Sequence, residues 1–163
     1  MPDDGYRREL VNGQLLVTPL PKMGHQNVVF QLGLLLGNAC PSELKVLPAA
    51  CDWKLSSDTV FEPDLMVLDR ADFDPDAVFT GTPRLVVEVL SPSTRDTDLT
   101  LKRLEYERAG VAAYWLVDPN RPSLTVLHLI GGGYQEMSRV EGSEPYRADL
   151  PFPVTVVAAQ LVS

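Results

Sequence analysis

The sequence predicts a mixed α/β fold from three observations. Runs of apolar residues, alternating or continuous and bounded by turn residues, recur along the chain and are typical of strands. One early stretch and one central stretch instead place apolar residues at helical spacing. The length of 163 residues, with 45% hydrophobic residues and no repeat or low-complexity tract, suits one domain with its own core. We therefore expect a single domain, residues 1–163, that combines strands with two helices.

The N-terminal segment predicts a β-hairpin followed by a helix. Residues 9–20 (ELVNGQLLVTPL) carry an Asn-Gly turn signal between two apolar runs, the usual signature of a hairpin. Residues 25–40 (HQNVVFQLGLLLGNAC) then change period. Their apolar positions at helical spacing are Val28, Leu32, Leu35 and Leu36. This spacing predicts an amphipathic helix.

Three strand-like segments follow. Residues 45–55 (KVLPAACDWKL) form the first, and Pro48 marks an edge position or a bulge because proline cannot donate to a ladder. Residues 62–69 (EPDLMVLD) and 84–91 (RLVVEVLS) are stronger strands, separated by a segment rich in Asp, Pro and Gly.

The second half begins with the central helix. Residues 91–96 supply capping chemistry, and residues 96–110 (DTDLTLKRLEYERAG) predict a helix that stops at Gly110. Residues 111–119 (VAAYWLVDP) predict a buried strand. A hairpin is expected after it, with strands 123–130 and 133–140 about three consecutive glycines.

Composition excludes several classes of protein. The formal charge of −8 argues against a protein that coats nucleic acid, because such proteins displace counterions with a positive surface. No apolar run is long enough to span a membrane, and the opening MPDDGYRREL lacks the order of a secretory signal. Cys40 and Cys51 lack metal-ligand spacing, and we expect core cysteines, with a disulfide as the alternative. These features predict a cytoplasmic protein without a membrane partner.

Glu88 is the first candidate site residue, because it is a carboxylate inside an otherwise apolar strand, LVVEVL. A buried carboxylate is costly unless it is protonated, paired with a cation or bound to a metal. Asp64 stands at the start of the preceding strand, and side chains of adjacent strands can converge on one face. Paired carboxylates suit Mg²⁺ or Mn²⁺, which also bind phosphate oxygens.

A helix face supplies a candidate cation for this pair. Asp98, Lys102 and Tyr106 recur at four-residue intervals along the predicted helix 96–110. If this face turns toward the strand ends, it brings an ammonium and a phenol to the carboxylates. Such a cation could orient an attacking water or stabilise negative charge on a phosphate.

These motifs together resemble a known family. The order ELVNG, a helix opened by His25, EPDLMVLD and then LVVEVLSPSTRDTDLTLKRLEYERAGVAAYWLVDP is similar to the Uma-type putative restriction endonuclease family, within the PD-(D/E)xK nuclease superfamily. The resemblance covers nearly the whole chain and is most specific over residues 84–119. It implies a restriction-endonuclease-like mixed central sheet flanked by helices, with additional β-hairpins.

The resemblance also implies an activity and its residues. It implies a Mg²⁺- or Mn²⁺-dependent endonuclease acting on DNA, with a homodimer as the expected assembly. Asp64 and Glu88 match the metal-binding acids, and Lys102 matches the family's helix lysine, whereas Leu90 occupies the position where the superfamily usually has lysine. Glu9 matches an N-terminal acid that serves as a further ligand or water-positioning base. Supporting positions are His25, Ser91, Asp98 and Tyr106.

Other interpretations of the same residues stay open at this point. Glu88 could form a structural ion pair with Arg84 or Lys102, and Asp98 with Lys102 could be an exposed helix pair. Tyr106 could be a core aromatic with its hydroxyl at the surface. For the whole protein, the alternatives are a non-catalytic binding or regulatory domain that keeps the nuclease fold, and a metal-dependent hydrolase of another phosphoester.

Overall fold

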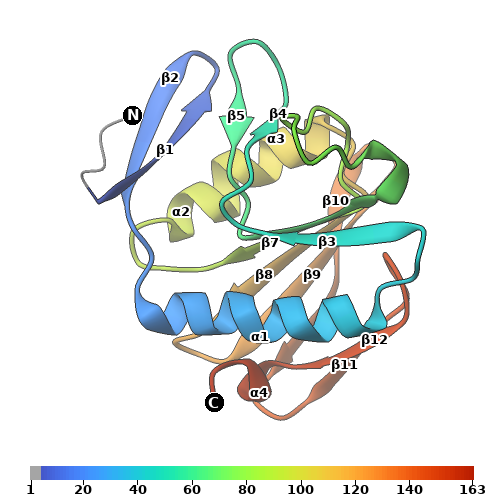
Figure 1. Cartoon of the computed structure of the whole chain (residues 1–163). Coiled ribbons are helices and arrows are strands. Elements are labelled where there is room, and N and C mark those ends of the chain that lie inside the picture. The colour runs from blue at the N-terminus through green and yellow to red at the C-terminus, as the bar shows by residue number, and fades with distance from the viewer. Residues whose placement is uncertain (1–4) are drawn as a thin grey trace.

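The computed structural model describes residues 5–163 and shows a mixed α/β architecture built around a six-stranded sheet (Figure 1). The strand order is β10-β9-β8-β7-β6-β3, and only the β7–β8 pair is parallel. These strands are β3 (Leu44–Pro48), β6 (Leu65–Asp69), β7 (Leu85–Val89), β8 (Ala113–Asp118), β9 (Ser123–Ile130) and β10 (Gly133–Glu141). A parallel pair needs a crossover connection, and the central helical segment supplies it.

A second sheet lies beside the first and has the order β2-β1-β5-β4. Its strands are β1 (Tyr6–Val11), β2 (Gln14–Pro19), β4 (Trp53–Lys54) and β5 (Val60–Phe61). Asn12 and Gly13 join β1 to β2, and both have positive φ, as a type I′ hairpin turn requires. This confirms the predicted N-terminal hairpin.

One face of the six-stranded sheet is covered by α1 (Met23–Ala39) and by the C-terminal segment (Figure 1). The C-terminal segment comprises β11 (Pro145–Ala148), β12 (Val154–Val157) and α4 (Ala158–Leu161). Leu32 and Leu36 of α1 are fully buried here against Val87 and Trp115 of the sheet. The apolar spacing read in residues 25–40 therefore corresponds to the buried stripe of α1.

The opposite face of the sheet is covered by the central helical segment and by the small sheet. This segment runs through α2 (Arg95–Thr97), a π-helical turn (Asp98–Lys102) and α3 (Arg103–Arg108). Side chains of β7 alternate between the two cores, with Val86 on this face and Val87 on the other. Glu88 shares the parity of Val86, and this parity directs it toward the central helical segment.

Three details differ from the predictions or refine them. Residues 45–55 are not one strand, because β3 joins the large sheet and β4 joins the small one, with Pro48 on the edge strand β3. Thr94 is the N-cap of α2, but its side chain makes no cap hydrogen bond. The side-chain capping predicted for residues 91–96 is therefore wrong at Thr94. Cys40 and Cys51 are free and partly buried, at the margins of the two cores. Among the described residues, no helix is long and apolar enough to cross a membrane.

Candidate active site

Asp64 and Glu88 are placed by the antiparallel pairing of β6 with β7. Leu65 pairs with Val87, so the next step of the register sets Asp64 across from Glu88. Both carboxylates are buried, with 2% and 1% of their residue surface exposed. The backbone N–H of Val89 donates to Asp64 Oδ2 at 2.8 Å and fixes that side chain against β7. The pairing thus sets the two acids across from each other on adjacent strands, and their role as metal ligands stays a prediction.

Lys102 is the cation opposite Glu88. Its Nζ donates to Glu88 Oε1 at 3.0 Å and lies 3.2 Å from Glu9 Oε1 and 3.5 Å from Asp98 Oδ1. The residue is 1% exposed, so the predicted helix face does turn toward the strand ends. The alternative of an exposed helix pair with Asp98 is wrong, because both side chains are buried.

Tyr106 completes the environment of Glu88. Its hydroxyl donates to Glu88 Oε1 at 2.7 Å, and its ring lies fully buried between Phe61 and Tyr114. The hydroxyl is therefore not at the surface, and it helps to hold the carboxylate in one orientation. Arg84 plays no part here, since it pairs with Asp69 at the molecular surface. The alternative pairing of Glu88 with Arg84 is thus excluded.

The π-helical turn Asp98–Lys102 shapes this part of the site. Its wider turn carries Asp98 and Lys102 at its two ends, and the hydroxyl of Tyr114 donates to the Asp98 carbonyl at 2.9 Å. Turns of this kind are rare and occur frequently at functional sites. The sequence predicts a helix here but gives no signal for the local change in helical period.

Asp64 is surrounded by three donors. Arg7 Nη1 donates to Oδ1 at 3.2 Å, while Oδ2 accepts the Val89 N–H and lies 3.2 Å from His25 Nε2. His25 lies in the first turn of α1, and its side chain is 10% exposed. His25, predicted as a supporting residue, is therefore a direct neighbour of Asp64.

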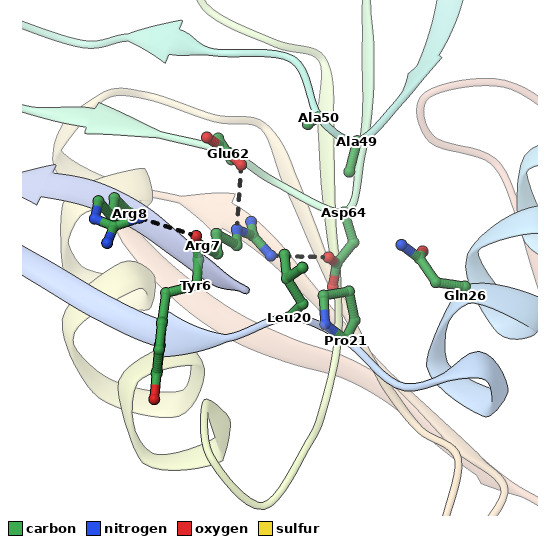
Figure 2. Close-up of a pocket in the computed structure, with 10 residues that line it drawn as sticks. All are labelled: Tyr6, Arg7, Arg8, Leu20, Pro21, Gln26, Ala49, Ala50, Glu62 and Asp64. Carbon is green, nitrogen blue, oxygen red and sulfur yellow. Dashed lines mark hydrogen bonds and ion pairs between the residues drawn. The ribbon is translucent and has the colours of Figure 1, made fainter. Parts of the chain in front are cut away.

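Glu9 and Arg7 reach the site from β1. Glu9 Oε1 accepts the backbone N–H of Glu62 at 2.8 Å, and Arg7 Nη2 lies 3.5 Å from the same oxygen. Arg7 Nε also lies 3.5 Å from Glu62 Oε2, as Figure 2 shows. Arg7 and Glu62 are site residues that sequence reasoning missed. The alternation of side chains along a strand could have identified them, because residues two positions apart share a face. Arg7 lies two positions before Glu9, and Glu62 lies two positions before Asp64.

Ser91 is the supporting residue that the structure does not bring into this cluster. Its hydroxyl lies 3.1 Å from Ser93 Oγ and 3.0 Å from Thr94 Oγ1, in the loop after β7. It lines a cavity of about 620 Å³, which His25 and Arg7 also line. Ser91 therefore lies beside the cluster rather than in contact with its carboxylates.

The electrostatics of the cluster follow from burial and from an excess of acids. Burial raises the pKa of Glu88 well above its usual value, and Asp64 and Asp98 raise it further although Lys102 lowers it. Burial also raises the pKa of Asp98 to about 6, against the lowering effects of Lys102 and Thr94. By contrast, His25, Arg7 and the Val89 N–H overcome the effect of burial and hold the pKa of Asp64 below its usual value.

The cationic partners show the complementary effect. Burial alone would lower the pKa of Lys102, but Glu88, Glu9 and Asp98 raise it above its usual value. Four buried carboxylates (Glu9, Asp64, Glu88, Asp98) thus face two permanent cations, Arg7 and Lys102. The cluster therefore holds more carboxyl groups than cations.

The site offers few ligands for a hard divalent cation. Within residues 5–163, no group of three or more His, Cys, Asp or Glu side chains is arranged around one metal position. Asp64 and Glu88 nevertheless supply two carboxylates, and Mg²⁺ is commonly bound by one or two carboxylates while it keeps several waters. The acid excess agrees with such a ligand pair, so the residues fit Mg²⁺ or Mn²⁺ rather than a cage-bound ion.

Comparisons with known proteins give a fold and a family for this chain. No curated protein matches the chain. A solved structure, described as a putative nuclease belonging to DUF820 from Anabaena variabilis, superposes with a TM-score of 0.73 at 19% identity, over 99% of this chain and 93% of that one. At this identity the likeness shows the fold. The model of the Uma2 family, described as "Putative restriction endonuclease", matches residues 1–160, and the chain therefore belongs to that family.

Proposed function

We propose that this protein is a Mg²⁺- or Mn²⁺-dependent endonuclease that hydrolyses phosphodiester bonds in DNA. The observation that carries the proposal is the contact of 3.0 Å between Lys102 Nζ and Glu88 Oε1. Position 90, where the superfamily usually has lysine, is a buried leucine in the apolar core. Lys102 thus supplies from the helix the ammonium that the strand lacks.

Asp64 and Glu88 would hold the metal ion. When bound, such an ion lowers the pKa of a water and polarises a phosphoryl oxygen. The chain's own residues prepare this pair. Val89 and His25 fix Asp64, while Tyr106 fixes Glu88, so neither carboxylate has to reorganise during the reaction.

Lys102 and Glu9 form the second part of the proposed machinery. The Lys102 ammonium stays charged at neutral pH because Glu88, Glu9 and Asp98 surround it. In this state it orients a water or offsets the charge that develops on the phosphate. Glu9 Oε1 lies 3.2 Å from the same ammonium, and we assign it a positioning role.

The cavity of about 620 Å³ beside Asp64 supports an anionic substrate in spite of the acidic composition. Among residues 5–163 no Asp or Glu lines it, whereas Arg7, Lys22 and His25 do. The hydroxyl residues Ser91, Ser93 and Thr94 form another part of its wall. Lys, Arg and hydroxyl side chains are the usual contacts of a nucleic-acid backbone. Ser91 therefore has a proposed role as a backbone contact.

The test is a Mn²⁺ titration by calorimetry, followed by incubation with supercoiled plasmid and with single-stranded DNA. We expect the wild type to bind Mn²⁺ and to cut, and Asp64→Asn and Glu88→Gln to lose both properties. Asp69→Asn is the matched control, because Asp69 is the last residue of β6, which Asp64 directly precedes, but Asp69 pairs with surface Arg84.

Three other results would contradict the proposal in different ways. Metal binding without cleavage of any DNA, but with release of phosphate from small esters, would favour a hydrolase of another phosphoester. Absence of both binding and cleavage in every variant would favour a non-catalytic domain. Cleavage by Asp64→Asn at the wild-type rate would remove Asp64 from the machinery.

A further inference from the structure

Arg7 lies inside the acid cluster although no motif assigns it a role. Its side chain is 10% exposed and points from β1 between Glu62 and Asp64, as Figure 2 shows. The guanidinium reaches three carboxylates, Asp64 at 3.2 Å and Glu9 and Glu62 at 3.5 Å each. It thus neutralises the same acid that a divalent cation would use.

The guanidinium is held mainly by charge. Of its hydrogen-bonding groups, Nη1 donates to Asp64 Oδ1, whereas Nε and Nη2 are buried without a hydrogen-bond partner among the described residues. A guanidinium has five N–H donors, so this position leaves most of its capacity unused. Displacing it from Asp64 would therefore cost few directional contacts.

The structure also leaves space next to this side chain. A cavity of about 240 Å³ is lined by Arg7, Asp64 and Glu62 together with Tyr6, Leu20 and Gln26 (Figure 2). The other donors to Asp64 have less freedom, because the Val89 N–H belongs to β7 and His25 belongs to the first turn of α1. Arg7 is consequently the donor that an incoming cation can displace.

We propose that Arg7 is a built-in competitor of the divalent cation. In the metal-free protein its guanidinium neutralises Asp64 and Glu9, and metal binding requires it to leave Asp64 for the adjacent cavity. This inference rests on the proposed function, because it takes Asp64 as a metal ligand. Two cations a few ångströms apart in a buried site repel strongly, and the repulsion weakens metal binding for as long as Arg7 stays.

Calorimetric titration with Mn²⁺ tests the competition directly. Arg7→Gln removes the charge, and we expect its Mn²⁺ affinity to exceed that of the wild type by roughly tenfold or more. Arg7→Lys keeps the charge and should change the affinity less. Arg84→Gln is the matched control, since it removes an arginine paired with an aspartate at the surface, and its affinity should equal that of the wild type.

A second measurement uses the wild type and so does not depend on the folding of a variant. Mg²⁺ is added to ¹⁵N-labelled protein, and the arginine Nε–H signals are followed by NMR, with the Arg7 signal assigned by its absence in Arg7→Lys. We expect this signal to shift in step with Mg²⁺ binding, with half of the change at the midpoint and saturation at full occupancy. A signal that stays unmoved while Mg²⁺ binds would overturn the proposal.

The outcomes separate this inference from the proposed function. If the wild type binds Mn²⁺ and Arg7→Gln binds equally or more weakly, Arg7 is a structural brace and only the inference fails. If neither the wild type nor Arg7→Gln binds Mn²⁺, both fail. Binding by Arg7→Gln alone would support the inference and would explain a weak wild-type site.

Discussion

At the scale of single residues, the site depends on a lysine that is almost completely buried. Lys102 is 1% exposed, and its charge is compensated by Glu88, Glu9 and Asp98 within 3.5 Å. Removing one partner of such a cluster leaves the others as buried, uncompensated charges. The resulting loss of stability exceeds the net stability that the intact pair contributes. Lys102 therefore contributes to folding as well as to the proposed chemistry.

This argument predicts the stability of two variants. Lys102→Met should lower the free energy of unfolding by about 3–5 kcal/mol at neutral pH, because it leaves Glu88 and Asp98 without their nearest cation. Tyr106→Phe removes only one hydrogen bond to Glu88 and should cost about 1.5–3 kcal/mol. Urea unfolding in the presence of EDTA measures both. A smaller loss for Lys102→Met than for Tyr106→Phe would show that Lys102 is not the main counter-charge.

Asp98 predicts a dependence of stability on pH. Its pKa in the folded protein, about 6, lies above the ordinary value of 3.8, so the folded state binds more protons than the unfolded state between these values. Stability from this group is therefore fully present below about pH 4 and is lost as pH rises through 6, by up to roughly 3 kcal/mol.

Asp98→Asn isolates this contribution, because it removes the titrating group and keeps the shape. Thermal unfolding of the wild type and of Asp98→Asn, each from pH 4.5 to 7.5 without metal, should show a steeper loss for the wild type. Parallel profiles for the two proteins would assign the pH dependence to other carboxyls, such as Glu88.

At the scale of elements, two local devices position the site. The β1–β2 hairpin carries Arg7 and Glu9 into the cluster, and its register depends on the Asn12–Gly13 turn. The π-helical turn presents Asp98 and Lys102 from the crossover between β7 and β8. Neither device is part of the large sheet, so Arg7 and Lys102 reach Asp64 and Glu88 from outside that sheet.

Two glycine substitutions, one in the hairpin turn and one in α1, should change the free energy of unfolding in opposite directions. Gly13→Ala should lower the free energy of unfolding by about 1 kcal/mol, because φ at this residue is +78° and an alanine is strained there. Gly37→Ala, in the exposed last turns of α1 with open space around its added Cβ, should raise it by about 0.5–1 kcal/mol. Urea unfolding measures both changes. An unchanged free energy of unfolding for Gly13→Ala would show that the hairpin tolerates another type of turn.

At the scale of the whole molecule, the sheet and its two covering layers bring together parts of the chain that are distant in sequence. Arg7 and Asp64 are 57 positions apart, and Glu88 and Lys102 are 14 apart. The homodimer, the single domain over residues 1–163 and the cytoplasmic location stay predictions. Sedimentation velocity at several protein concentrations tests the first of these, with one species at twice the mass of 18.0 kDa as the expected result.

The local order of strands and helices was accessible from the sequence wherever a long pattern was present. Residues 84–91 were recognised because a nearly continuous apolar run is visible in the sequence, and the same run made Glu88 conspicuous. Strands such as β5, with two residues, carry no such pattern and exist only through their pairing with β1 and β4. The C-terminal strands β11 and β12 were likewise not among the strands predicted individually from the sequence.

The sequence by itself determined the fold class, the two acids on neighbouring strands and the helix face that holds Asp98, Lys102 and Tyr106. These follow from periodicity, which is a local property of the chain. Only the tertiary structure decided that Lys102 contacts both Glu88 and Glu9, that Arg7 occupies the cluster and that Ser91 lies outside it. Such contacts depend on how distant segments pack, because the path of the backbone, and not the spacing of residues, sets which buried charges meet.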